Sequence, residues 1–197
     1  MGSSPLGLQG RAFTPHPGVN MLKFALATGL GALVLAAPVA SAQDSTKLSD
    51  ANVVAIFQKA NQKDVETGNL AAEKASNKEV KDMGKMFADA HKGLKDQAAD
   101  LAKKIKVNPV LPADKMGDQA HDKVMSDLKA KSGADFDKAW LAQEIEYHQA
   151  VIDYVTNTLL PATKNPELKA FIEKAAPAFQ GHLVAAQNLY KKLGYTT

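Results

Sequence analysis

The residues with the strongest potential for chemistry lie in one patterned segment, from Trp140 to Val151. At about 100° per residue, Glu144 and His148 fall at the centre of an apolar stripe, one helical turn apart. An ionisable side chain buried among apolar neighbours is strongly destabilising unless it is paired or binds a metal. We therefore expect Glu144 and His148 to find partners in other segments.

Three further ionisable residues, Asp64, His91 and His182, interrupt apolar stripes elsewhere in the chain. Imidazole and carboxylate groups are typical ligands of borderline transition metals. If these stripes face one another, three imidazoles and two carboxylates meet in one core layer. The sequence then predicts a single transition-metal ion, Zn, Cu or Fe, bound by Asp64, His91, Glu144, His148 and His182.

The same residues have simpler explanations, because a lone His on an apolar face is usually a hydrogen-bonded core residue. An internal network of carboxylates and imidazoles can also fix helix register without a metal. A di-iron oxidase would need Glu-x-x-His on two helices, whereas this chain has only Glu144-x-x-x-His148. Three functions therefore stay open: an exported metal-binding protein, a metal-dependent redox enzyme, and a non-catalytic envelope protein with a structural polar core. No catalytic residue is predicted.

Helical periodicity extends over most of residues 43–197 and indicates an all-α fold. We expect long helices over residues 50–75, 78–106, 135–160 and from 165 onward, with a shorter helix over 114–131. Two helical hairpins joined by a crossover that contains the short helix predict a ferritin-like four-helix bundle. Counted from the hairpin turns at about 1.5 Å per residue, all five candidate ligands lie near mid-height.

Local signals mark the ends of these helices. The segment from Ser76 to Glu79 is typical of a capping box and predicts a tight turn between the first two helices. Pro161 is expected to end the fourth helix, and Asn165 followed by Pro166 to begin the last. Pro177 is expected to kink that last helix.

The N-terminal part of the chain has the pattern of an export signal. Residues 21–42 combine a basic start at Lys23, an apolar run too short to span a bilayer, and the cleavage site Ala40-Ser41-Ala42. We expect a Sec-type signal peptide cleaved after Ala42, export to the periplasm, and no transmembrane anchor in the mature chain. Residues 1–20 are interpreted as a mis-called start or a leader, and residues 43–197 as the bundle domain.

The composition of the mature chain excludes several classes of function. Without Arg11 and Lys23, the 24 basic residues become 22, all of them Lys, against 21 acidic residues. A nearly neutral domain without Arg is a poor nucleic-acid binder, so no nucleic-acid partner is expected. The absence of Cys excludes disulfides, thiolate ligands and thiol chemistry. Nothing in the sequence indicates a protein partner.

The chain also resembles a family of exported bacterial proteins, domain of unknown function 4142, a ferritin-like group often labelled as outer membrane proteins. The resemblance rests on four motifs: Gly68 to Ala75, Val80 with Asp89-Ala-His91, Phe136-Asp137 ahead of His148, and Pro177 ahead of His182. Two features differ from the family pattern. Asp64 stands where Glu is usual, and Ala90 separates Asp89 from His91. The resemblance implies the fold and the export, but no established activity.

Overall fold

The computed structural model describes residues 48–112 and 118–195. Its helices are α1 (Asp50–Lys74), α2 (Lys78–Lys104), α3 (Asp118–Lys129), α4 (Gly133–Tyr154), the π-helix η1 (Val155–Leu159), α5 (Leu160–Ala162) and α6 (Pro166–Lys192). No strand occurs in these residues, which confirms the all-α prediction. The ferritin-like assignment stays a prediction. The expected leader and signal peptide, residues 1–20 and 21–42, lie outside the described residues.

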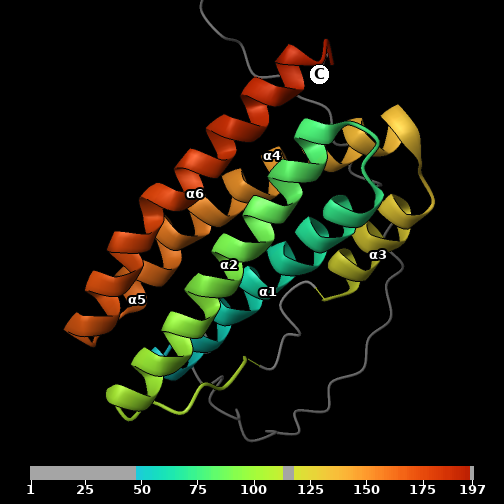
Figure 1. Ribbon diagram of the computed structural model, residues 1–197. Coiled ribbons are helices and arrows are strands. Elements are labelled where there is room, and N and C mark those ends of the chain that lie inside the picture. Colours follow the sequence, from blue (N-terminus) through green and yellow to red (C-terminus); the bar gives the residue numbers. More distant parts are fainter. Residues whose placement is uncertain (1–47, 113–117, 196–197) are drawn as a thin grey trace, which may run out of the picture. The chain divides into compact units, whose positions relative to one another are not determined.

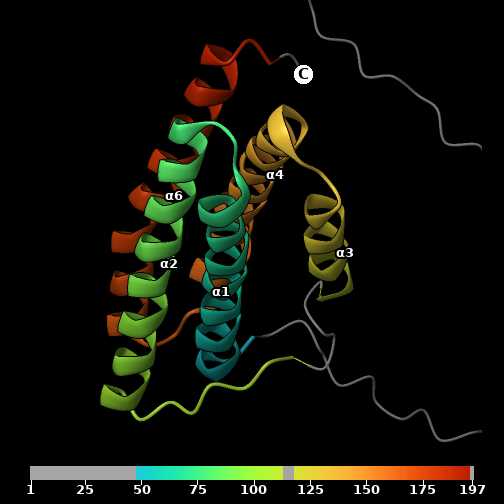
Figure 2. The ribbon, with the colours of Figure 1, turned by 45° about the vertical axis from the view of Figure 1, so that its right-hand side comes forward.

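The long helices form two antiparallel hairpins that pack against each other (Figure 1). One hairpin is α1 with α2, and the other is α4, continued by η1 and α5, with α6. Helix α3 lies in the crossover connection, on the side of α1 and α4 (Figure 2). It is attached to α1 by a salt bridge of 2.5 Å between Lys59 Nζ and Asp118 Oδ1.

The first hairpin is unusually close-packed where two glycines meet. A Cβ atom added to Gly68 would lie 2.6 Å from the backbone oxygen of Gly84, and one added to Gly84 would lie 2.6 Å from Ala71 Cβ. No real side chain tolerates such distances, so α1 and α2 approach this closely only because both residues are glycine.

The turn between α1 and α2 differs from the sequence prediction. Asn77, not Ser76, is the N-cap, and its side chain accepts hydrogen bonds from the backbone of Glu79 and Val80. Ser76 instead contacts the other hairpin, since its backbone N–H and hydroxyl both donate to the buried carboxylate of Asp137. The capping-box prediction was wrong because tertiary contact with Asp137 outweighed the local motif.

The turn of the second hairpin is bound in a similar way by the first. The backbone N–H groups of Lys164 and Asn165 donate to the two carboxylate oxygens of Asp50, at 2.8 and 3.1 Å. Asn165 also caps α6 as predicted. Each hairpin turn is therefore held by an aspartate from the opposite hairpin, and together these contacts set the register between the two.

Helix α4 does not end before Pro161. It widens into η1 over Val155–Leu159 and then continues as α5 to Ala162. Pro161 directly follows the π turn, as the second residue of the short α5 segment. Helix α6 continues through Pro177 to Lys192, and a kink at Pro177 stays a prediction.

The core consists of two apolar clusters with a polar layer between them. One cluster includes Phe57, Ile172 and Phe179, and the other includes Phe87 and Trp140. The ring of His91 lies 5.6 Å from Phe179 of the first cluster and 6.4 Å from Phe87 of the second. The histidines are thus enclosed between aromatic side chains above and below.

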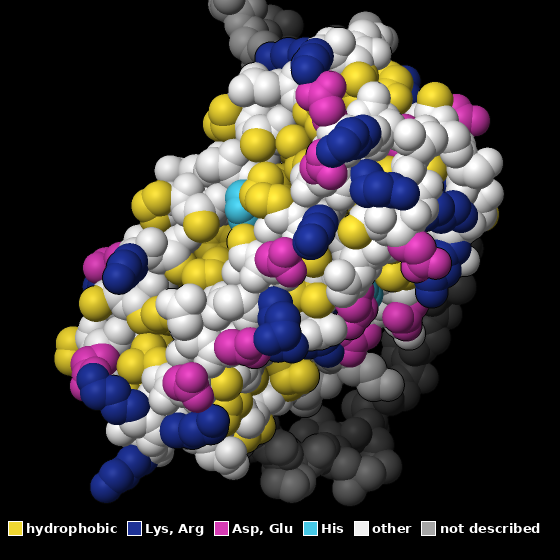
Figure 3. Space-filling view, viewed as in Figure 1, with side chains coloured by type: hydrophobic (Ala, Val, Ile, Leu, Met, Phe, Trp, Pro, Cys, Tyr) yellow, Lys and Arg dark blue, Asp and Glu magenta, His cyan; other side chains and the backbone are white. Residues whose placement is uncertain are grey.

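The surface carries charges of both signs. On the face seen in Figure 3, Lys side chains alternate with Asp and Glu, and cyan His atoms are visible among hydrophobic side chains. No helix in the described part of the chain is long and apolar enough to cross a membrane.

Candidate metal centre

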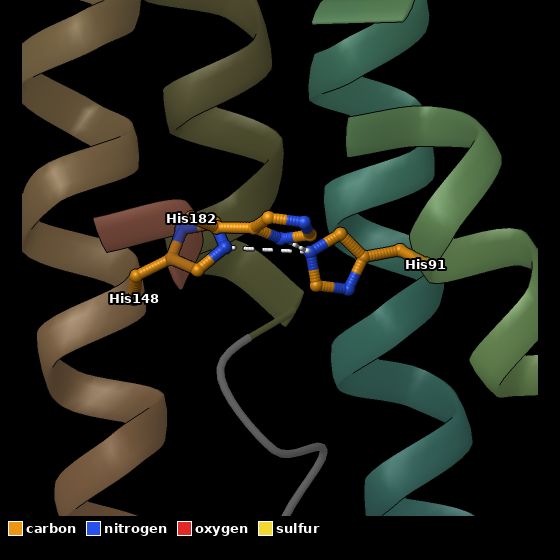
Figure 4. Close-up of side chains that lie close together, drawn as sticks. All are labelled: His91, His148 and His182. Atoms are coloured by element: carbon orange, nitrogen blue, oxygen red, sulfur yellow. Dashed lines mark hydrogen bonds between the residues drawn. The ribbon is translucent and has the colours of Figure 1, made fainter. Parts of the chain in front are cut away.

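Three histidines from three different helices converge in the polar layer. His91 comes from α2, His148 from α4 and His182 from α6, and their rings turn toward one another (Figure 4). His91 Nε2 lies 3.3 Å from His148 Nε2 and 3.0 Å from His182 Nδ1. His91 and His148 are fully buried, whereas His182 keeps 9% of its surface exposed.

Neighbouring groups determine which nitrogen of each buried ring carries the proton. The Nδ2 group of Asn61 donates to Phe57 O at 2.7 Å, which orients the amide so that Asn61 Oδ1 accepts from His91 Nδ1 at 2.8 Å. Likewise, His148 Nδ1 donates to the backbone oxygen of Glu144 at 2.9 Å. Both rings therefore have unprotonated Nε2 atoms, and these two lone pairs face each other.

Burial also keeps the imidazoles neutral. Desolvation, with smaller contributions from His148 and His182, lowers the pKa of His91 from 6.5 to about 2. Desolvation likewise lowers the pKa of His148 to about 4, and it lowers the pKa of His182. Neutral imidazole is the form that binds metals, so at neutral pH no proton has to leave the cluster first.

The two predicted carboxylates lie on the Nδ1 side of the same rings. Asp64 Oδ2 is 3.6 Å from His91 Nδ1, and Glu144 Oε2 is 3.5 Å from His148 Nδ1. Both side chains are buried, and Asp64 Oδ1 and both carboxylate oxygens of Glu144 have no hydrogen-bond partner. Orphaned buried oxygens of this kind are strongly destabilising unless a proton or a cation compensates them.

The carboxylates also influence each other. Burial raises the pKa of Glu144 from 4.5 to about 7, and burial together with the nearby Glu144 raises the pKa of Asp64 well above its ordinary value. The pair therefore retains a proton near neutral pH in the absence of a cation. Two neighbouring carboxylates have this effect because two negative charges close together in a core without water are strongly unfavourable.

The geometry of the three imidazoles fits a transition metal. In a tetrahedral site with metal–nitrogen bonds of about 2.0–2.1 Å, ligand nitrogens are about 3.3–3.4 Å apart. The distances of 3.3 and 3.0 Å between ring nitrogens are close to this value. Three protein ligands would leave the fourth position of such a site open.

The five predicted residues thus share one layer, but they divide into two groups. His91, His148 and His182 form one possible ligand set, and Asp64, Glu144 and His148 form another, with ligand atoms in each set within 4.8 Å of one another. His148 belongs to both. The sequence predicted one set of five ligands, and the structure separates an all-nitrogen set from a carboxylate-rich one.

Sequence reasoning missed several residues that support the site. Asn61 is fully buried and orients His91. Its position four residues after Phe57 on the apolar face of α1 was a signal that could have identified it. Asp137 was noted only within a family motif, because its partners lie about sixty residues away in the first hairpin turn.

His121 has a different environment from the three clustered histidines. Its Nε2 atom lies 2.8 Å from Glu66 Oε2, so it forms a hydrogen bond between α3 and α1. His121 is therefore a useful control for histidine substitutions in the cluster.

Comparison with known proteins gives a family but no activity. A family model described as "Domain of unknown function (DUF4142)" matches residues 35–189. No curated protein and no solved structure matches the chain. Any function must therefore be argued from the site itself.

Proposed function

Since this chain belongs to the DUF4142 family, which is defined without an activity, we propose a function from the geometry of its core. The protein is an exported, helical metal-binding protein that holds one transition-metal ion, Zn, Cu or Fe, in the mid-bundle layer. His91, His148 and His182 supply the nitrogen ligands. Asp64 and Glu144 provide negative charge next to the ion. They form a second possible ligand set with His148, which also belongs to the set of three histidines.

The observation that carries this proposal is the pair of facing lone pairs on His91 Nε2 and His148 Nε2, 3.3 Å apart. Two acceptor nitrogens at this distance repel each other unless something positive lies between them. A proton could bridge only one pair of atoms, whereas a metal ion satisfies all three rings at once. The buried, partnerless oxygens of Glu144 further favour a site that holds positive charge.

The support around the rings is also typical of metal sites. Ligating histidines usually donate their second ring N–H to a carbonyl or carboxylate, which fixes the tautomer and raises the basicity of the other nitrogen. Here Asn61 Oδ1 and the backbone oxygen of Glu144 accept those hydrogen bonds. The protein itself would thus contribute the orientation of the ligands and a dry environment.

Metal analysis and the variant His148→Ala test the proposal. Wild type should bind close to one equivalent of Zn²⁺, Cu²⁺ or Fe²⁺ and unfold at higher temperature with the metal than with chelator. His148→Ala should lose at least about tenfold in metal affinity and most of that stabilisation. His121→Ala is the matched control, and it should retain both.

A metal-free polar core is the competing function, supported by the 3.0 Å contact between His182 Nδ1 and His91 Nε2, which suits a hydrogen bond. In that case His148→Ala would destabilise the protein in chelator by about 1–3 kcal/mol, because a buried partner is lost. Equal stability of wild type with and without each metal would exclude the metal-binding proposal. Oxygen-dependent turnover by the metal-loaded protein would instead indicate a redox enzyme.

A further inference from the structure

Of the three clustered histidines, His182 is the one in contact with the surface. It keeps 9% of its surface exposed, whereas His91 and His148 are fully buried. His182 Nδ1 faces His91 Nε2 at 3.0 Å, so the Nε2 atom on the other edge of the His182 ring is directed away from the cluster. Of these three side chains, an ion that arrives from solvent therefore meets His182 first.

An open groove of about 510 Å³ lies next to His182, with walls from both α2 and α6. Met86 of α2 and Ala185 of α6 line it, and His182 precedes Ala185 by three residues, about 4.5 Å along the helix axis. Phe87, the residue after Met86, stacks on the His182 ring with the ring centroids 4.3 Å apart. The groove is thus adjacent to the exposed edge of the histidine layer.

The groove offers sulfur to a metal ion. Met83 and Met86 both line it, three residues apart on one face of α2. Met86 is 44% exposed, so filling the core does not explain it. The carboxylates of Glu79 and Asp82, at the same groove, are each paired with a lysine, at 2.6 and 2.5 Å. Besides the amide of Asn188, the two thioethers are therefore the donors that remain for an ion.

Thioether sulfur selects a narrow class of metal ions. Methionine, a soft ligand, favours Cu(I), whereas carboxylate, carbonyl and water ligands suit Mg²⁺, Ca²⁺ and Mn²⁺. Imidazole suits copper as well as zinc, iron and nickel. Copper is thus the metal that both the groove and the histidine layer can bind.

We propose that Met83 and Met86 form a surface site for Cu(I), and that this site delivers the ion by way of His182 to the three-histidine layer. The delivery step rests on the proposed function, whereas binding at the groove does not. During delivery, thioether ligands are exchanged for imidazole nitrogens. Copper keeps its oxidation state, so no electron donor or acceptor is needed.

Ag⁺, a soft monovalent ion without redox chemistry in buffer, is the probe for the groove. In the purified protein labelled with ¹³C at the methionine methyl groups, Ag⁺ should shift the resonances of Met83 and Met86. The resonance of Met125, on α3, is the internal control and should stay in place. The same concentration of Zn²⁺ should shift none of the three. The inference is overturned if Ag⁺ leaves Met83 and Met86 unshifted.

Cu(I) uptake tests the delivery step. Under anaerobic conditions, the protein takes the ion from its coloured ferrozine complex, and stopped-flow absorbance gives the rate. The double variant Met83→Leu/Met86→Leu, which preserves side-chain volume, should take up Cu(I) at least about tenfold more slowly. Its Zn²⁺ affinity and its thermal midpoint in chelator should equal those of wild type. Met125→Leu is the matched control and should take up Cu(I) at the wild-type rate.

Two outcomes of the uptake experiment separate this inference from the proposed function. Uptake by the double variant at the wild-type rate would overturn the delivery role of the methionines. If His148→Ala instead took up as much Cu(I) as wild type, with the Ag⁺ shifts of Met83 and Met86 intact, the ion would stop at the groove. That result would contradict the three-histidine site, which is the proposed function, and with it the delivery step.

Discussion

Asn61 determines which nitrogen of His91 faces the other two imidazoles. Its amide is fixed by Phe57 O on one side, so its oxygen can only accept from His91 Nδ1 on the other. Asn61 therefore leaves His91 Nε2 unprotonated, as the proposed metal site requires. Similar outer contacts in metalloproteins often change metal affinity by about 10- to 100-fold.

We therefore expect Asn61→Leu to weaken metal binding by about tenfold or more, because His91 Nδ1 loses its acceptor and the ring is no longer held in one tautomer. Asn61→Asp should preserve most of the affinity, since a carboxylate oxygen also accepts from Nδ1. Competition with a chromophoric Zn²⁺ chelator measures both variants. An affinity of Asn61→Leu equal to that of wild type would contradict the role assigned to Asn61.

Glu144 should make the stability of the metal-free protein depend on pH. Burial raises its pKa from 4.5 to about 7, so between these values the folded state binds a proton that the unfolded state has released. The stabilising contribution of this proton is complete below pH 4.5 and is lost as the pH rises through 7. The histidines act in the opposite sense, because burial lowers the pKa of each and stability is lost as the pH falls below 6.5.

The variant Glu144→Gln separates the two effects, since it removes the carboxylate and keeps the histidines. Relative to wild type, its free energy of unfolding in chelator should increase by about 1–3 kcal/mol between pH 4.5 and 7. Urea denaturation at several pH values gives this difference directly. If the difference between the two proteins were independent of pH, the raised pKa of Glu144 would be wrong.

At the scale of the elements, the contact of Gly68 with Gly84 brings α1 and α2 together. Gly84→Ala should destabilise the protein by about 1–3 kcal/mol, because its Cβ would lie 2.6 Å from Ala71 Cβ and 2.8 Å from Gly68 O. Gly93→Ala is the control on the same helix, where the nearest atom would be 3.9 Å away. That variant should be stabilised by about 0.5–1 kcal/mol, because alanine favours helix.

Denaturant unfolding of the two variants compares a close helix contact with an open helix surface. Opposite signs are expected, and the change should be confined to stability, with the helical circular dichroism spectrum preserved. A stability of Gly84→Ala as high as that of Gly93→Ala would show that the backbone contact between α1 and α2 is looser than the structure indicates.

At the scale of the whole molecule, the register between the hairpins decides whether the candidate ligands meet. Asp137 and Asp50 each bind the turn of the opposite hairpin, at the two ends of the bundle. With both ends held, His91 of one hairpin is level with His148 and His182 of the other. A shift of one helical turn, about 5.4 Å, would separate them beyond ligand distance.

Export is a second property of the whole chain and stays a prediction from residues 21–42, which lie outside the described residues. Protein recovered from the cell envelope should begin at Gln43, because the signal peptide is expected to be cleaved after Ala42. Intact-mass measurement identifies the N-terminus, and Ala42→Pro should block cleavage. An envelope protein that retained Met1 would contradict both the cleavage site and the processing.

Much of the architecture follows from the sequence alone. Apolar residues that recur with a helical period predicted the long helices, and the predicted capping residue Asn165 agrees with the observed start of α6. Periodicity carries this information because burial of one helix face is the main source of stability in such a fold. It also indicated Asp64, His91, Glu144, His148 and His182 as polar residues on buried faces.

Only the tertiary structure decided how those residues meet. Periodicity assigns a residue to a helix face. It does not determine how a histidine ring is rotated, which ring nitrogen carries the proton, or which of several hydrogen bonds forms at a turn. The alternative partner of Ser76, the orientation of His91 by Asn61 and the division of the candidate ligands around His148 all depend on atoms distant in the chain.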